Sequence, residues 1–199
     1  MSDESPKVIV IAGPNGAGKS TLAPLLLRDE YGVTEFVNAD TIAQGLSAFA
    51  PETVAFEAGR IMLRRMKELA GRRLNFAFET TLSSRSYARW LADLRRHGYE
   101  FDLMFLGLLS PDLAVQRVRE RVRLGGHDVP EAVIRRRYFK GLKNFFRLYQ
   151  VLADSWGVYD NSNDDPPRLI AEGCSDNLVN LYDEITWQKI VRRANEGGA

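Results

Sequence analysis

The stretch that decides the fold is Gly13-Pro14-Asn15-Gly16-Ala17-Gly18-Lys19-Ser20. It matches G-x-x-x-x-G-K-[ST], a loop whose backbone N–H groups surround phosphate oxygens. The apolar residues 7–12 before it predict a strand, and residues 18–29 are compatible with a helix. Strand, loop and helix in this order are the context that separates a phosphate-binding loop from a chance glycine-rich turn. The stretch therefore predicts a site for a nucleoside triphosphate with Mg²⁺.

Within this loop, Lys19 supplies a charge for the β- and γ-phosphates, and the Ser20 hydroxyl is a predicted Mg²⁺ ligand. The start of the helix adds unpaired N–H donors and the positive end of its dipole. The predicted cofactors are thus ATP and Mg²⁺. The predicted ATP-binding residues are Gly13, Pro14, Asn15, Gly16, Ala17, Gly18, Lys19, Ser20, Thr21 and, from a later helix, Arg117.

Length and composition limit the remaining choices. The chain has 199 residues and a formal net charge of +1, so we expect one domain, residues 1–199, without a general basic field for nucleic acid. The single cysteine, Cys174, cannot form an intrachain disulfide. Residues 1–6 do not resemble a signal peptide, and the longest apolar run is too short to span a bilayer. We therefore expect a cytoplasmic protein that does not associate with a membrane.

Apolar runs alternate with helical patterns along the rest of the chain. Further strands are expected at 35–38, 74–78, 101–109 and 156–161, with 168–171 as a candidate sixth. Helices are expected at 51–71, 84–96, 111–124, 130–154 and 177–194. This alternation predicts an α/β fold with a parallel sheet covered by helices on both faces. Ligands of such sheets bind at the carboxyl ends of the strands, where the phosphate loop, Asp40 and Glu79 all fall.

Two carboxylates therefore gather beside the loop. Asp40 can accept or orient the proton of an attacking hydroxyl, or it can cap a helix that follows. Glu79 can hold the Mg²⁺ shell or contact the acceptor, and its alternative is a solvated acid at a strand end. Thr81 offers a hydroxyl to the same space, or is simply a residue that favours strands.

A glycine pair, Gly125-Gly126, joins two basic helices and suggests a mobile lid over about residues 111–140. Arg121 shares a helix face with Arg117. On the second helix, Arg135 and Arg137 lie at the edges of the apolar stripe and are expected to point inward, while Arg136 is expected to face solvent. Arginines closing on the phosphoryl group would neutralise its charge; the alternative is a solvated basic face.

With these residues in hand, the chain resembles the zeta toxin family of P-loop kinases over most of residues 7–163. The resemblance is carried by the loop with Thr21, by Asn38-Ala39-Asp40, by Phe78-Glu79-Thr80-Thr81-Leu82, and by the segment from Arg121 to Tyr138. It implies strand order 2-3-1-4-5, an antitoxin partner and, as acceptor, a UDP-N-acetylhexosamine phosphorylated on its sugar 3′-hydroxyl. It also implies that the turn Tyr159-Asp160-Asn161-Ser162 borders the nucleotide base.

The same resemblance assigns roles to individual residues. It gives Asp40 as the base, Glu79 and Thr81 as acceptor contacts, and arginines between Arg117 and Arg137 as the lid. The family carries an arginine soon after Glu-x-Thr; this chain has Ser83 there, and Arg85 follows two residues later. Arg85 is therefore the candidate for that acceptor contact.

Together these observations predict an ATP-dependent kinase for a small-molecule hydroxyl. Its predicted catalytic residues are Lys19, Asp40, Arg121 and Arg137; its acceptor-binding residues are Asp40, Glu79, Thr81 and Arg85; its metal ligands are Ser20 and Glu79. Two alternatives stay open. One is a switch ATPase that acts on a protein partner, and the other is a nucleic-acid end kinase, against which the near-neutral charge argues.

Overall fold

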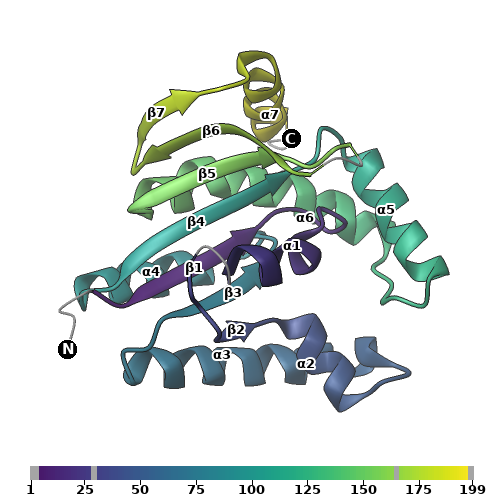
Figure 1. Ribbon diagram of the computed structural model, residues 1–199. Helices are drawn as coiled ribbons and strands as arrows, with labels where there is room; N and C mark the ends of the chain where they lie inside the picture. Colours follow the sequence, from purple (N-terminus) through teal and green to yellow (C-terminus); the bar gives the residue numbers. More distant parts are fainter. Residues whose placement is uncertain (1–4, 28–30, 164–165, 197–199) are drawn as a thin grey trace.

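The computed structural model describes residues 5–27, 31–163 and 166–196, shown in Figure 1. Across them one seven-stranded sheet runs in the order β2-β3-β1-β4-β5-β6-β7. The first five strands are parallel, so the predicted order 2-3-1-4-5 is confirmed, and β6 and β7 extend the sheet in antiparallel fashion. The strands are β1 Lys7–Ala12, β2 Phe36–Val37, β3 Phe76–Thr80, β4 Glu100–Gly107, β5 Ser155–Asp160, β6 Arg168–Cys174 and β7 Asn177–Leu181.

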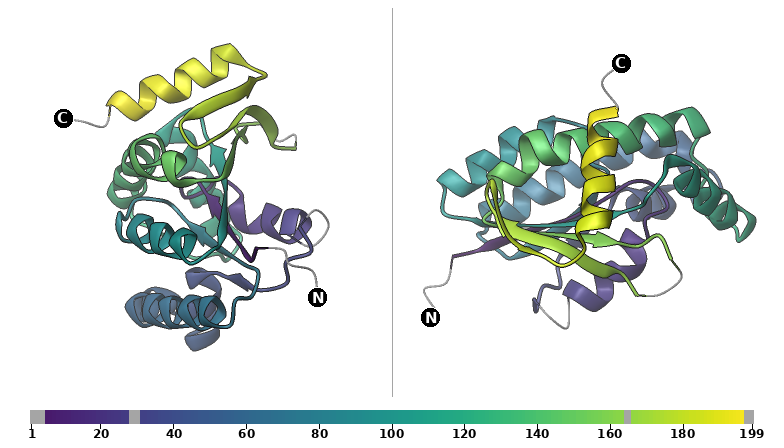
Figure 2. Two further views of the ribbon diagram at one scale, coloured as in Figure 1. Left: turned by 90° about the vertical axis from the view of Figure 1, so that its left-hand side faces the viewer. Right: turned by 90° about the horizontal axis from the view of Figure 1, so that it is seen from above.

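Helices cover both faces of this sheet, as predicted. Figure 2 shows α3, α4, α6 and α7 on one face and α1 on the other. The helices are α1 Lys19–Leu25, α2 Ala39–Leu46, α3 Ala55–Gly71, α4 Ser86–Arg96, α5 Pro111–Arg123, α6 Glu131–Asn144 and α7 Glu184–Glu196. Short turns of other helix types lie at Pro51–Val54, Phe145–Tyr149 and Gln150–Leu152. No helix of the described residues combines the length and apolar character that a membrane crossing requires.

The core explains why the central strands read as unbroken apolar runs. Residues 8–12 of β1 are fully buried, and β4 is buried from Phe101 onward, as expected for parallel strands with helices on both sides. Towards α6, Phe105 packs on Phe145, and Trp156 of β5 stacks on Trp187 of α7. This packing holds β4 and β5 against the helices on this face of the sheet.

The predicted terminal helix over 177–194 is wrong at its start. Residues 177–181 form β7, which pairs with β6, and only Glu184–Glu196 is helical. A two-residue turn closes the hairpin because Cys174 pairs with Asn177 and Ser175 adopts φ +49°. Of the β7 residues only Val179 clearly favours a strand, and the turn before them is Ser-Asp rather than the Asn-Gly or Asp-Gly pair that usually marks such a hairpin.

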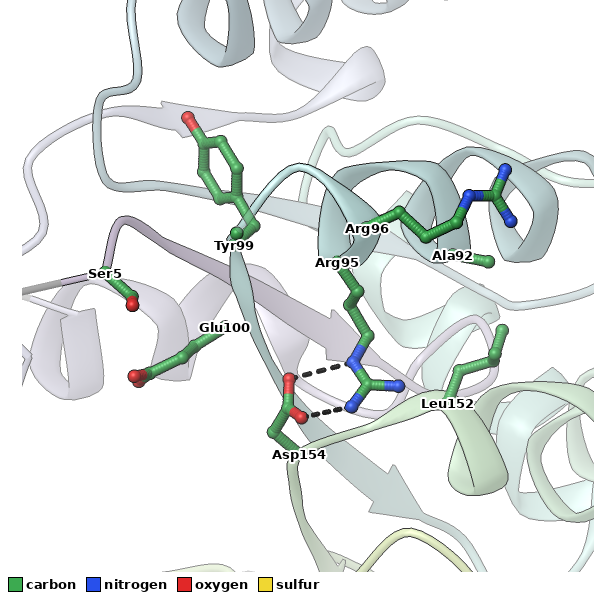
Figure 3. A pocket seen from close by; sticks show the side chains of 9 residues that line it. Ser5, Ala92, Arg95, Arg96, Tyr99, Glu100, Leu152 and Asp154 are labelled. Carbon is green, nitrogen blue, oxygen red and sulfur yellow. Dashed lines mark hydrogen bonds and ion pairs between the residues drawn. The ribbon is translucent and has the colours of Figure 1, made fainter.

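A cavity of about 520 Å³ lies at the opposite, amino edge of the sheet (Figure 3). An ion pair between Arg95 of α4 and Asp154 crosses it, with Arg95 Nε 3.0 Å from Asp154 Oδ2. The same carboxylate accepts the Phe101 N–H at 2.8 Å. Because parallel sheets bind ligands at their carboxyl ends, we assign this pair to structure: it ties α4 and the start of β4 to the segment that enters β5.

Candidate active site

The phosphate loop connects β1 to α1, and two of its glycines are required by geometry. Gly13 has φ +143°, and a Cβ built on it would lie 2.2 Å from the Leu106 carbonyl oxygen. Gly18 has φ +78° and is the N-cap of α1, with no side chain bonded to the first turn. The N–H groups at the start of α1 therefore have no capping side chain and point to the loop.

The close approach of Gly13 to Leu106 predicts that any side chain at position 13 destabilises the fold. Gly13→Ala should lower the free energy of unfolding by about 2 kcal/mol or more, because the methyl group meets backbone at a φ that alanine avoids. This corresponds to a Tm lower by about 4–8 °C for a chain of this size. The control is Gly59→Ala within α3, where a Cβ has open space and helix propensity improves. Equal Tm values for the two variants in thermal denaturation followed by circular dichroism would contradict the prediction.

Lys19 lies at the centre of the site and is only 6% exposed. Its ammonium donates to the Pro14 carbonyl oxygen at 2.8 Å and lies 3.5 Å from Glu79 Oε1. Burial holds the pKa of Lys19 below its ordinary value, and the nearby carboxylates of Glu79 and Asp40 only partly oppose that effect. A buried cation of this kind gains most from a strongly anionic ligand, which a triphosphate provides.

Glu79 joins the loop to the second strand. Its Oε2 accepts from the Ser20 hydroxyl at 2.6 Å and from Asn38 Nδ2 at 2.7 Å. Ser20 and Glu79 thus offer adjacent oxygen donors, the ligand type that Mg²⁺ prefers. The described residues hold no cluster of three or more His, Cys, Asp or Glu side chains fit for a metal. Mg²⁺ typically takes one or two protein oxygens and completes its shell with phosphate and water.

Asn38 has two roles that the sequence did not predict: it caps α2 and it contacts Glu79. Its Oδ1 accepts from the backbone N–H groups of Asp40 at 2.7 Å and Thr41 at 3.2 Å, so Asn38 caps α2. The alternative interpretation of Asp40 as a helix cap is therefore wrong. Asparagine directly before a helix is a common N-cap, and that signal was present in Asn38-Ala39-Asp40. With the cap supplied by Asn38, the Asp40 side chain faces the cavity.

Two cavities meet the phosphate loop from different sides. One, of about 770 Å³, is lined mainly by loop, α5 and the segment after β5: Gly16, Gly18, Thr21, Leu22, Arg117, Glu120, Arg121, Leu124, Gly126, Asn161, Asn163, Pro166 and Pro167. The other, of about 240 Å³, is lined by Asn15, Lys19, Asn38, Ala39, Asp40, Met62, Glu79, Thr80, Thr81, Ser83, Ser84, Tyr87 and Arg137. We call them the nucleotide-side and the acceptor-side cavity. The structure thus brings Asp40, Glu79 and Thr81 together.

The nucleotide-side cavity contains two of the predicted arginines. Arg117 donates to the carbonyl oxygens of Asn161 at 2.5 Å and Asn163 at 3.0 Å. Asn161 in turn donates to the Ala17 carbonyl oxygen at 2.9 Å, which fastens the turn after β5 to the loop. Arg121 donates to the His127 carbonyl oxygen at 2.6 Å, and its charge acts on Lys19. Arg117 and Arg121 are therefore held on this side by backbone carbonyls.

Arg137 lines the acceptor-side cavity instead. Burial lowers the pKa of Arg137, and the charge of Asp40, which lines the same cavity, opposes that effect. Arg136 is exposed, as predicted. Arg135 does not point inward: it pairs with Glu131 at 2.8 Å and Asp112 at 2.6 Å. The Glu131–Arg135 spacing of i, i+4 explains the error, because such pairs hold an arginine along the outer helix surface.

Arg85 lies exposed at the N-cap of α4. The wall of the acceptor-side cavity beside it is formed by Ser83, Ser84 and Tyr87. The predicted lid is anchored over part of its length, because Ile134 and Tyr138 of α6 are buried and the Tyr138 hydroxyl donates to Leu108 O at 2.7 Å. The α6 part of the predicted lid is therefore packed on the core.

A mostly parallel sheet with a phosphate loop after β1 and carboxylates at the neighbouring strand ends defines a class of enzyme, the ATP-dependent P-loop kinases. The zeta toxin family model matches residues 1–165, and the chain belongs to the zeta toxin family. The matched region ends before β6, so β6, β7 and α7 lie beyond it.

The chain is also similar to individual proteins. An uncharacterized protein of Haemophilus influenzae is 27% identical over 132 residues, which cover 66% of this chain and 92% of that protein. A chain of the AvrRxo1-ORF1:-ORF2 complex solved with ATP has a TM-score of 0.71 and 16% identity. The match covers 94% of this chain but only 64% of the AvrRxo1 chain. A chain of the PezAT toxin–antitoxin system of Streptococcus pneumoniae has a TM-score of 0.63 and 16% identity. The match covers 99% of this chain and 89% of the PezAT chain. At these identities the two structures show a shared fold.

Proposed function

We propose that this kinase transfers the γ-phosphoryl group of ATP to a hydroxyl group of a small molecule. The observation that carries the proposal is the pair of cavities on two sides of one phosphate loop. Lys19 lies in the acceptor-side wall, while the glycines and Thr21 that follow the phosphate chain lie in the other. A donor bound on one side would present its terminal phosphate to an acceptor on the other.

On the donor side, the loop from Gly13 to Thr21 would hold the triphosphate, with Arg117 and the turn at Asn161 beside the nucleoside. Lys19 would exchange its contact with Glu79 for the phosphates. Ser20 and Glu79 would hold Mg²⁺, which neutralises charge on the β- and γ-phosphates when bound. Arg121 would offset the negative charge that builds up during transfer.

On the acceptor side, Asp40 would orient the hydroxyl and take its proton. A bond forms between the acceptor oxygen and the γ-phosphorus, the bond from that phosphorus to the bridging oxygen breaks, and ADP leaves. Arg137 would stabilise the transferring group, since it lines the same cavity as Asp40. Glu79, Thr81 and Arg85 are the proposed acceptor contacts, with Arg85 depending on a movement of its exposed side chain.

The first acceptor to test is a UDP-N-acetylhexosamine, on the strength of the family resemblance. Purified protein is incubated with ATP, Mg²⁺ and a panel of UDP-sugars and other hydroxylated metabolites, and products are analysed by mass spectrometry. We expect an acceptor heavier by one phosphoryl group. Formation of only ADP and free phosphate across the panel would favour a switch ATPase instead. Strong salt-dependent binding of single-stranded nucleic acid would favour an end kinase.

We also propose a protein partner that restrains the activity. The AvrRxo1 structure contains two different proteins, ORF1 and ORF2, and the PezAT structure comes from a toxin–antitoxin system. Such a partner would act by covering one of the two cavities. Co-expression with the product of a neighbouring gene, followed by the kinase assay, tests this. Unchanged activity in a stable complex would contradict it.

Arg137 and Arg136 form a matched pair for testing the acceptor side. Arg137→Ala should lower kcat by about 10²-fold, because it removes a half-buried positive charge from the cavity that Asp40 also lines. Arg136→Ala removes the same side chain from the exposed face of α6, and kcat should stay within about twofold of wild type. Initial rates at saturating ATP compare the two. Equal rates for both variants would remove Arg137 from the mechanism.

A further inference from the structure

The inference begins with the two adjacent glycines that follow α5. Gly125 has φ +85°, and a Cβ built on it would have open space around it. Gly126 has no positive φ, but a Cβ built on it would lie 2.5 Å from Cγ of Arg121 and 3.3 Å from its Cδ. The backbone therefore requires the first glycine, and the side chain of Arg121 requires the second.

The end of α5 shows that the turn itself does not need a glycine at position 126. The Gly125 N–H donates to the Val122 carbonyl oxygen and the Gly126 N–H donates to the Arg121 carbonyl oxygen, both at 2.9 Å. These two bonds form a Schellman motif, whose left-handed residue is usually glycine and here is Gly125. The next residue often carries an apolar side chain that packs back on the last turn of the helix. Gly126 instead leaves this space to the Arg121 side chain.

The half-buried Arg121 side chain is held at two points along its length. It runs along Gly126, and its Nη2 donates to the His127 carbonyl oxygen at 2.6 Å. Arg121 lines the nucleotide-side cavity together with Gly16 and Gly18 of the phosphate loop. A guanidinium fixed there before transfer begins needs little reorganisation when charge builds on the phosphoryl group.

We propose that Gly126 is a positioning residue: because it has no side chain, the Arg121 guanidinium can lie at the nucleotide-side cavity. This inference rests on the proposed kinase function, in which Arg121 offsets the charge that builds up during transfer. A methyl group at position 126 would force Arg121 into another rotamer, because Cγ is too near the backbone for the end of the side chain to absorb the shift. The second glycine of the predicted hinge thus serves one arginine.

A double-mutant cycle between positions 121 and 126 tests this role with the acceptor that the panel identifies. Arg121→Ala should lower kcat by about 10²-fold, because it removes the charge itself. Gly126→Ala should lower kcat by about tenfold, because a misplaced guanidinium loses part of its effect. The double variant should match Arg121→Ala within about twofold, since no guanidinium remains to be misplaced. Losses that multiply, or a wild-type kcat for Gly126→Ala, would overturn the inference.

Thermal denaturation applies the same cycle to the folded protein. Gly126→Ala should lower Tm, and adding Arg121→Ala should recover part of that loss, because Cγ and Cδ are then gone. No recovery would mean that the methyl group meets only backbone. That result would overturn the inference even where Gly126→Ala is too unstable for kinetic measurements.

Gly125→Ala is the matched control in the same turn. It strains a φ of +85° without approaching Arg121, so Tm should fall while kcat stays within about threefold of wild type. A kcat loss equal to that of Gly126→Ala would assign both glycines to loop motion and overturn the inference.

Calorimetry separates positioning from nucleotide binding. The MgATP affinity of Gly126→Ala should stay within about threefold of wild type, and a loss of binding as large as the kinetic loss would overturn the inference. If product forms but the cycle shows no coupling, the inference fails and the proposed function stands. A panel with no phosphorylated product refutes the proposed function, and this inference with it.

Discussion

Lys19→Ala should abolish nucleotide turnover, with the rate falling by about 10³-fold or more. The ammonium is buried within the loop, and that burial lowers its pKa. Burying this charge costs free energy in the free protein, and the negative charge of a bound phosphate chain would offset that cost. Removing it takes away the positive charge aimed at the β- and γ-phosphates. We expect MgATP binding by calorimetry to weaken and product formation to fall below detection.

Loss of folding must be distinguished from loss of function in this variant. Lys19→Ala leaves the Glu79 carboxylate without its cation, although Ser20 and Asn38 still donate to it. The double variant Lys19→Met and Glu79→Gln removes both charges and keeps side-chain volume, so its Tm should stay within a few degrees of wild type. Both variants should fail to turn over ATP. Wild-type turnover in a folded Lys19→Ala protein would refute the assignment of the loop.

Much of this fold follows from short patterns whose physics is local. Residues 8–12 are apolar throughout because β1 is buried on both faces, and the glycines after them are dictated by φ and by contact with Leu106. Chain position alone placed Asp40 and Glu79 at one sheet edge, since parallel strands end together. The acceptor-side cavity is the consequence of that rule.

What the sequence missed depends on contacts between distant residues. Asn38 links the cap of α2 to Glu79, 41 residues away, and no local pattern reports such a bond. Arg135 and Arg137 stand at similar edges of one apolar stripe, yet the first pairs with Asp112 and the second lines the cavity that contains Asp40. The prediction of helix over 177–181 is wrong because pairing with β6 outweighs the local propensity of these residues.

Asp40→Asn should separate binding from transfer. The substitution keeps the shape of the side chain and removes the carboxylate that we assign to the acceptor hydroxyl. A positioned base is worth about 10²–10⁴-fold, and phosphoryl transition states need little proton removal, so we expect a loss of kcat near the lower end, about 10²-fold. MgATP affinity should change by less than about threefold, because the loop, Ser20 and Glu79 are untouched.

Asp40 also lies in the first turn of α2, so the variant loses a favourable charge at a helix N-terminus. Asp112→Asn is the matched control: Asp112 occupies the first turn of α5, is mostly exposed, and gives up only a surface ion pair with Arg135. Both variants should have similar Tm values, while only Asp40→Asn should lose transfer. If phosphorylated acceptor forms at the wild-type rate in Asp40→Asn, the hydroxyl is oriented by another group, and Glu79 in the same cavity becomes the residue to replace next.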